Sequence, residues 1–248
     1  MKKLLISGCS NAAGFDITDK GDSHLNRSKS FGNVLARKFN REPVNAALGG
    51  ATNNSITRIV IDYCENNSVE DLAVLIAYTD IDRLDVPWTT EIDHTHANTS
   101  SNYYKNIYSA FNHINVNWEG LGEEKQLLPP YHDFITNNPS YMEINGATQT
   151  ILLQNYLQNR SIPYVMCNTM HMYNKFDLDI PPAVALYRDW INEEYYLNPF
   201  DNSKCFYWYY RDLGYDSRGD YWHHGEEPHA LYADQLESFI LERGIRTF

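Results

Sequence analysis

Short apolar runs that end in turns of small or polar residues recur along this chain. The first run starts at Lys3, and residues 71–78 form the clearest one. Unbroken apolar runs of this length are typical of strands buried on both faces of a parallel sheet. The pattern predicts buried strands at residues 3–6, 43–48, 71–78 and 162–168.

Between these runs, apolar residues recur at helical spacing. Ser30 precedes the first such segment and is a typical N-cap residue. The aromatic run at residues 206–210 is assigned no element, and residues 211–219 are rich in turn formers. Helices are predicted at residues 31–39, 56–63, 103–114, 144–157, 183–196 and 229–243.

The alternation of strands and helices implies a parallel sheet covered by helices on both faces. We therefore expect an α/β fold with three layers, α/β/α, and a flavodoxin-like parallel sheet. The chain has 248 residues, which suits one domain over residues 1–248. Residues 84–141 are polar and aromatic and fit this alternation poorly. They are expected to form an insertion over the edge of the sheet where the strands end.

Charge and cysteine content narrow the class of protein. The formal net charge of −12 argues against binding to nucleic acid or to an anionic membrane, because both require a positive surface. The N-terminal apolar run is too short for a signal peptide, and no stretch reaches the length of a membrane span. We expect a cytoplasmic protein. The scattered cysteines fit buried thiols better than disulfides or a zinc site: Cys9, Cys64, Cys167 and Cys205.

A serine and a histidine carry the candidate chemistry. Ser10 follows the first predicted strand, at the edge where α/β proteins place their sites, and it is a candidate nucleophile or an ordinary turn serine. Asp220 and His223 lie three residues apart, just before the last predicted helix. They suit the roles of orienting carboxylate and general base. Neighbouring Cys9 is expected to be a packed core thiol and not a nucleophile.

Other titratable residues leave alternatives open. The cluster of His223, His224 and His229 with two glutamates invites a metal interpretation, but its spacing differs from helical zinc motifs. Capping or packing suits His229 better, so no metal site is predicted. Arg83 follows the third strand and is expected to pair with Asp80, with a substrate carboxylate as the alternative.

The first two blocks resemble the SGNH (GDSL-type) hydrolase superfamily. That family has a strand followed by Gly-Asp-Ser, and here the corresponding residues are Gly8-Cys9-Ser10. Its second block is Val-Asn-x-x-x-x-Gly followed by a small residue and threonine. Residues 44–52 match it closely, with Gly50 at the functional glycine.

The last block strengthens the resemblance. The family has Asp-x-x-His shortly before a terminal helix that carries an alanine, and here these are Asp220, His223 and Ala233. The matching blocks span nearly the whole chain in order and leave residues 84–141 uncovered. The resemblance implies a source in a bacterium or a phage.

Two positions depart from the family. Cys9 replaces the aspartate before the serine, and Thr79 replaces the asparagine of a Gly-x-Asn-Asp block whose side chain donates to the oxyanion. The resemblance implies an oxyanion hole made by the backbone N–H groups of Ser10 and Gly50 together with Thr79. Asn53 or Asn54 is a possible substitute donor.

The resemblance implies a serine esterase that uses Ser10, His223 and Asp220 and needs no metal or organic cofactor. The substrate is expected to be a small acyl ester, first of all an O-acetyl ester, on a small molecule or a carbohydrate. Tryptophans and tyrosines form a stacking surface for a sugar or pack the core instead. Residues expected near the substrate are Asn53, Asp80 and Trp222.

Two other functions remain open. One is an acyltransferase that uses the same residues with an alcohol in place of water. The other is a non-catalytic binding protein that retains the fold, for which Thr79 and the insertion are the main support. The sequence predicts no oligomeric state.

Overall fold

The computed structural model describes residues 2–87, 111–114, 133–134, 137–173, 182–218, 222–245 and 248. At its centre lies a parallel sheet of four strands in the order β2-β1-β3-β6. All four predicted strands are confirmed: β1 (Lys3–Gly8), β2 (Glu42–Asn45), β3 (Leu72–Tyr78) and β6 (Tyr164–Asn168).

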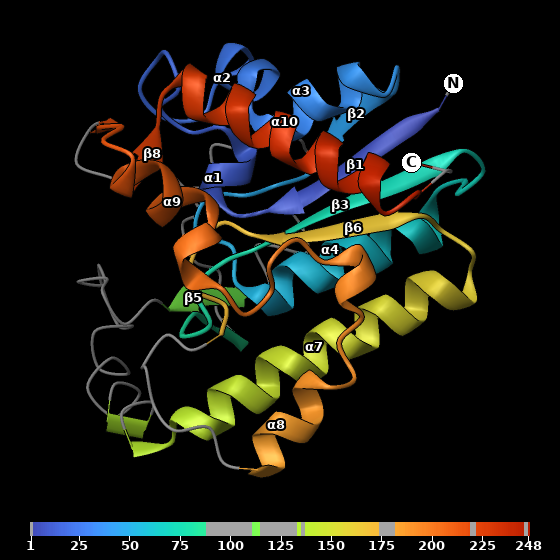
Figure 1. The fold of residues 1–248 in the computed structure, drawn as a ribbon, viewed down its shortest axis with the longest axis vertical. Coiled ribbons are helices and arrows are strands. Elements are labelled where there is room, and N and C mark those ends of the chain that lie inside the picture. The colour runs from blue at the N-terminus through green and yellow to red at the C-terminus, as the bar shows by residue number, and fades with distance from the viewer. Residues whose placement is uncertain are drawn as a thin grey trace.

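The strand order indicates where a ligand would bind at the edge of the sheet. Ile6 of β1 pairs with Asn45 of β2 on one side and with Leu75 of β3 on the other, and all pairs are parallel. The carboxyl ends of the strands therefore meet at one edge, which Figure 1 shows at the end where α1, α9 and β8 gather. The order reverses between β1 and β3, and open α/β sheets bind ligands at such a reversal.

Helices cover both faces of the sheet. On one face lie α2 (His24–Lys29), α3 (Phe31–Lys38) and α10 (Glu226–Glu242), and on the other lie α4 (Asn53–Asn66) and α7 (Pro139–Asn159) (Figure 1). Successive strand residues point to opposite faces. Leu4 and Ile6 accordingly join the cluster under α3 and α10, whereas Leu5 joins the cluster under α4 and α7. The α/β fold with helices on both faces is confirmed and is compatible with a flavodoxin-like sheet.

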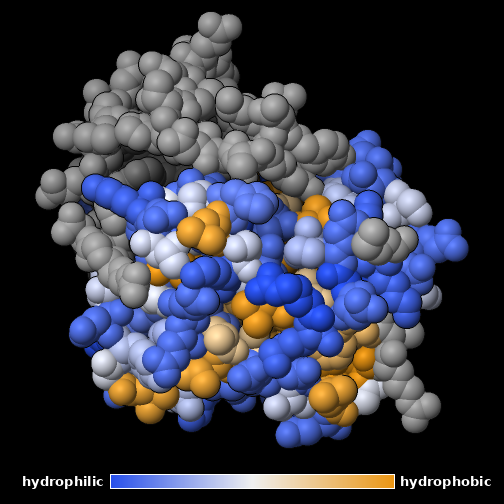
Figure 2. All heavy atoms as spheres, turned by 90° about the horizontal axis from the view of Figure 1, so that it is seen from above, coloured by the Kyte–Doolittle hydropathy of each residue, from blue (hydrophilic) through white to orange (hydrophobic). Residues whose placement is uncertain are grey.

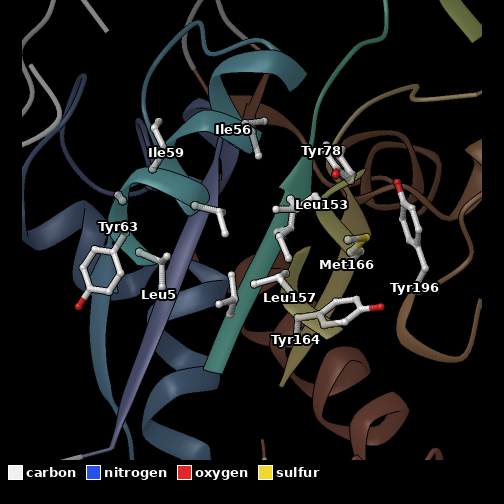
Figure 3. Close-up of a cluster of buried hydrophobic side chains, with 14 of the residues drawn as sticks. Leu5, Ile56, Ile59, Tyr63, Tyr78, Leu153, Leu157, Tyr164, Met166 and Tyr196 are labelled. Carbon is white, nitrogen blue, oxygen red and sulfur yellow. The ribbon is translucent and has the colours of Figure 1, made fainter. Parts of the chain in front are cut away.

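The cluster under α4 and α7 is rich in tyrosine. Figure 3 shows Ile56 and Ile59 of α4 and Leu153 of α7 together with residues of β1, β3 and β6 in this cluster. Tyr196 is buried at its side, and its hydroxyl donates to Asn168 Oδ1 at 2.6 Å. Satisfying a buried hydroxyl in this way lets a large aromatic ring fill the core without an unpaired polar group.

The outer surface over α2, α3 and α10 is mostly hydrophilic, with small separate apolar areas (Figure 2). Lys38 of α3 contacts both Asp234 and Glu237 of α10, and Lys29 of α2 contacts Glu226. Exposed pairs of this kind contribute little to stability individually. They fix which side chains of α3 and α10 face each other.

Two of the sequence assignments are wrong in part. Residues 103–114 were predicted as a helix, but β5 (Phe111–Ile114) is a strand that pairs antiparallel with β4 (Leu84–Pro87). The spacing of Phe111 and Ile114 fits a helix, and pairing with β4 overrides it. Residues 103–110 lie outside the described residues. Helix α7 starts at Pro139, earlier than the helix predicted at residues 144–157.

The predicted helix at residues 183–196 is shorter in the structure. Helix α8 (Pro182–Arg188) ends early, and a 3₁₀ turn, η2 (Glu193–Tyr195), follows. Gln154 of α7 explains the break, because its amide donates to Trp190 O at 2.6 Å and accepts from Asn192 N–H at 3.0 Å. These bonds take up peptide groups that a longer helix would have paired internally.

The C-terminal part contains elements that the sequence left open. The aromatic run forms α9 (Phe206–Asp212), preceded by the 3₁₀ turn η3 (Asn202–Lys204). Short strands β7 (Ser217–Arg218) and β8 (His223–His224) pair before α10. Ser30 lies at the N-cap position of α3, but its hydroxyl makes no capping bond. Instead, His229 Nδ1 of α10 accepts from Phe31 N–H at 3.2 Å.

The cysteines are core thiols, and the described helices are short or polar. All four cysteines are buried and free, as predicted. Burial raises the pKa of Cys64 to about 11 and those of Cys167 and Cys205 to about 12, so these thiols are poor nucleophiles. Among the described residues, no helix combines the length and the apolarity that crossing a bilayer requires.

Candidate functional site

The turn after β1 presents Ser10 at the carboxyl edge of the sheet. Ser10 opens the one-turn helix α1 (Ser10–Ala13), which Gly14 ends in the left-handed region at φ +86°. Gly8 makes this close turn possible, because a Cβ there would lie 2.5 Å from the Ala12 side chain. Ser10 is half-buried, and its hydroxyl makes no hydrogen bond within the described part of the chain. Cys9 is fully buried with its sulfur 3.2 Å from Thr169 Oγ1, as expected for a packed thiol.

The turn after β2 lies beside this serine. Hydrogen bonds continue past the end of β2, from Ala46 N–H to Ile6 O and from Leu48 N–H to Gly8 O. The same register brings the next residues, Gly49 and Gly50, level with Ser10. Gly50 has φ +74°, a conformation that favours glycine. The structure thus brings two of the expected oxyanion donors, the Ser10 and Gly50 peptides, to neighbouring strand ends.

Thr79 occupies the corresponding position after β3. Gly8 pairs with Ala77, so Thr79 lies level with Ser10. Its N–H donates to Asn53 Oδ1 at 2.8 Å, and Asn53 Nδ2 donates back to Thr79 O at 3.1 Å. Both ends of the Asn53 amide are therefore occupied, which argues against Asn53 as a substitute oxyanion donor. The buried Thr79 hydroxyl has no hydrogen-bond partner within the described residues.

The two remaining predicted substrate contacts differ in exposure. Asp80 is buried, and its carboxylate accepts from His171 N–H at 3.2 Å. Trp222 is 46% exposed, and its ring lies against those of Tyr207 and Trp208. Trp222 therefore offers an open aromatic face next to His223, whereas the Asp80 carboxylate links the loop after β3 to the loop after β6.

His223 reaches this edge from β8, which packs against α1. Its Nδ1 lies 2.7 Å from Asp16 Oδ2, and both side chains are about nine-tenths buried. The ring of Phe15 lies next to both the turn after β2 and His223. It contacts Gly49, and its centroid is 5.8 Å from that of the His223 ring. A buried imidazole paired with a carboxylate therefore lies in the neighbourhood of Ser10.

The loop that carries Asp16 is rigidly built. Asp16 has φ +58°, and its second oxygen accepts from Gly21 N–H. Fully buried Asn26 holds the loop together, because its oxygen accepts from Thr18 N–H and Asp19 N–H while its amide donates to Asp19 O and Gly21 O. Both carboxylate oxygens of Asp16 thus have donors, which fixes the plane of the carboxylate before any ligand arrives.

Electrostatics favour a neutral His223 at neutral pH. Burial lowers the pKa of His223, the Asp16 carboxylate opposes this, and the positive charge of Arg83 lowers the pKa further. A carboxylate acceptor at Nδ1 selects the tautomer with the proton there. The lone pair is then on Nε2, as a general base requires.

The other histidines of the suspected metal cluster have partners elsewhere. Asp220 lies outside the described residues. His224 Nε2 is 2.9 Å from Tyr207 O, and His229 accepts from Phe31 N–H, so the histidines of the suspected metal cluster have different partners. Nowhere in the described part of the chain do three or more His, Cys, Asp or Glu side chains form a group that could hold a metal. Arg83 forms no ion pair with Asp80 among the described residues, contrary to the expected pairing.

Asp16 is the residue that sequence reasoning missed. The sequence pattern assigns Asp16 no role, because its contact with His223 spans 207 positions of the chain. The only local signal is its place directly after the Ser10 turn.

Neither a scan against protein-family models, nor a search of curated proteins, nor a search of solved structures finds a match for this chain.

Proposed function

We propose that this protein is a serine esterase of the SGNH type, with Ser10 as nucleophile, His223 as base and Asp16 as the carboxylate that orients the base. One observation carries the proposal. His223 and Asp16 form a buried pair with their side chains 2.7 Å apart, and His223 is on β8, which packs against the helix that Ser10 opens. A buried imidazole with a carboxylate at Nδ1 is the arrangement that activates a serine in unrelated hydrolases.

The residues permit a balanced acyl transfer. Ser10 Oγ attacks the ester carbonyl carbon while His223 Nε2 takes the hydroxyl proton, and Asp16 stabilises the resulting imidazolium. The tetrahedral intermediate then expels the alcohol, which leaves with the proton from His223. Water attacks the acyl-enzyme with His223 as base again, and the acid and free Ser10 are released.

Stabilisation of the oxyanion is assigned to the peptide N–H groups of Ser10 and Gly50 and to the Thr79 hydroxyl. A donor aimed at the developing charge contributes most when it needs no reorganisation. The Thr79 hydroxyl is suited to this role because it is buried and has no hydrogen-bond partner among the described residues. Threonine has a shorter reach than the asparagine of the family, so we expect a slower enzyme than the family pattern allows.

The hydroxyl of Ser10 makes no hydrogen bond to another described residue. Contacts between catalytic groups are often long in the free enzyme and shorten when substrate binds. The proposal requires only a local adjustment, because α1 and β8 are already packed together.

The substrate class follows from the surroundings. We propose a small acyl ester, first an O-acetyl ester, on a small molecule or a carbohydrate. The exposed face of Trp222, with Trp208 beside it and His171 stacked on Trp208 at 5.0 Å, supports a sugar-sized alcohol part. An acyltransferase would use the same groups, and product analysis with an added alcohol acceptor distinguishes the two reactions.

A fluorophosphonate probe tests the proposal. We expect the probe to form a covalent adduct on Ser10 that peptide mass spectrometry locates, and the folded protein to cleave p-nitrophenyl acetate. Ser10→Ala should abolish both, with Ser28→Ala, a half-buried serine on α2, as the matched control. A folded wild-type protein that is never labelled and cleaves no ester would favour the non-catalytic binding protein.

A further inference from the structure

Arg83 is a half-buried cation near the proposed site, and none of the described carboxylates pairs with it. It ends the loop that follows β3, and its Nη1 donates to Ala51 O at 3.2 Å. Its Nε is buried and has no hydrogen-bond partner within the described residues. A guanidinium has five N–H donors, and this one uses a single protein acceptor among those residues.

Three other arginines that are at least partly buried each pair with a carboxylate. Arg27 pairs with Asp22, Arg58 with Asp85 and Arg188 with Glu143, each at 2.7 Å or less. Unlike these three arginines, Arg83 forms no ion pair with a described residue, in a chain whose formal net charge is −12.

The position of Arg83 relates it to the reacting groups. Ala51 directly follows Gly50, so the guanidinium is bonded to the turn that supplies a proposed oxyanion donor. Its positive charge also lowers the pKa of His223. The guanidinium is therefore bonded to the oxyanion turn and lies close enough to the base for its charge to act there.

The chemistry of a guanidinium defines the ligand. Its planar fork presents two parallel N–H groups that match the two oxygens of a carboxylate or phosphate. Leaving a partly buried cation without an anion is unfavourable, and an incoming anion removes that cost. A neutral ester offers Arg83 no carboxylate or phosphate to bind.

We propose that Arg83 binds an anionic group, a carboxylate or a phosphate, that the substrate carries close to its ester. The inference rests on the proposed function and specifies its substrate class: an acidic ester. The charged group is held beside Gly50, which positions the ester carbonyl between Ser10 and the oxyanion donors.

Matched esters test this. Mono-p-nitrophenyl succinate carries a carboxylate, and p-nitrophenyl butyrate is its neutral counterpart of equal acyl length. We expect the ratio of kcat/KM for the acidic ester to that for the neutral ester to fall about 10- to 100-fold in Arg83→Gln, the loss expected for a hydrogen bond to a charged group. Arg83→Lys, which keeps the charge and loses the fork, should give an intermediate ratio. The control is Arg37→Gln, an exposed arginine on α3, whose ratio should equal that of the wild type.

A binding measurement separates this inference from the esterase proposal. Acetate and inorganic phosphate are added to Ser10→Ala with and without Arg83→Gln, and the rise in Tm is recorded. A rise with either anion that Arg83→Gln removes supports the subsite, even if neither ester is cleaved, and the larger rise identifies the preferred anion. An unchanged ester ratio in Arg83→Gln, or equal Tm shifts in both proteins, would overturn it.

Discussion

His223 and His229 are close in sequence and both are buried, but they contact different kinds of groups. His223 faces the Asp16 carboxylate at the carboxyl edge of the sheet. His229 of α10 faces α3, where its ring nitrogen accepts from Phe31 N–H. Its ring stacks on that of Phe31 and lies tilted against that of Phe206. Burial lowers the pKa of both, and only His223 has a carboxylate that opposes this.

The contrast separates an imidazole that packs from one that can take up a proton. His229 has a pKa of about 3, so it remains a neutral acceptor that caps α3. His223 can become charged during a reaction, because Asp16 stabilises the imidazolium. Burial of a histidine therefore indicates little until the chemistry of its partner is known.

The largest expected effect concerns His223. His223→Ala should lower kcat/KM for p-nitrophenyl acetate by about 10⁴-fold or more, because the base is lost. Fluorophosphonate labelling of Ser10 should fall in parallel. The comparison variant is His229→Leu, whose kcat/KM at 25 °C should remain within about twofold of the wild type. Equal losses in the two variants would break the distinction between the two histidines.

The next effect is on acid stability. His229 binds a proton in the unfolded chain near its ordinary pKa of 6.5 but in the folded chain only near 3, so the unfolded state binds more protons between these values. Stability from this group is complete above pH 6.5 and is lost as the pH falls toward 3. Between pH 7 and pH 4.5 the free energy of unfolding should drop by about 3 kcal/mol from His229 alone.

His229→Leu sharpens this measurement. At pH 7 it should cost about 2 kcal/mol, because the buried Phe31 N–H loses its acceptor. In urea unfolding at pH 4.5 the variant should be as stable as the wild type or more stable. A variant that keeps the wild-type pH dependence would mean that His229 does not carry the acid sensitivity.

The sequence predicted the sheet well and the site only in part. The strands were readable because residues such as Leu72–Tyr78 are apolar throughout, a pattern that parallel sheets impose. Ser10, Gly50 and Thr79 follow directly from the strand ends. Asp16 was not readable, because its role depends on a contact 207 positions away and on a loop organised by Asn26.

The misassigned elements have a similar cause. The end of α8 depends on Gln154 of another helix, and β5 depends on pairing with β4. The aromatic run of α9 has strand-like composition but buries Phe206, Tyr207 and Tyr210 on a helix. In each case a tertiary contact decides between local alternatives, and a single sequence carries no record of that contact.

The rate at which a fluorophosphonate labels Ser10, measured against pH in the wild type, Asp16→Asn and Asp220→Asn, tests the central claim most directly. The account predicts that the wild-type rate rises with pH through a midpoint below 6.5. In Asp16→Asn it should be about 10²–10⁴-fold lower at pH 7, with the midpoint at lower pH because the stabilising carboxylate is gone. Wild-type labelling in Asp16→Asn, with the loss found in Asp220→Asn instead, would contradict it.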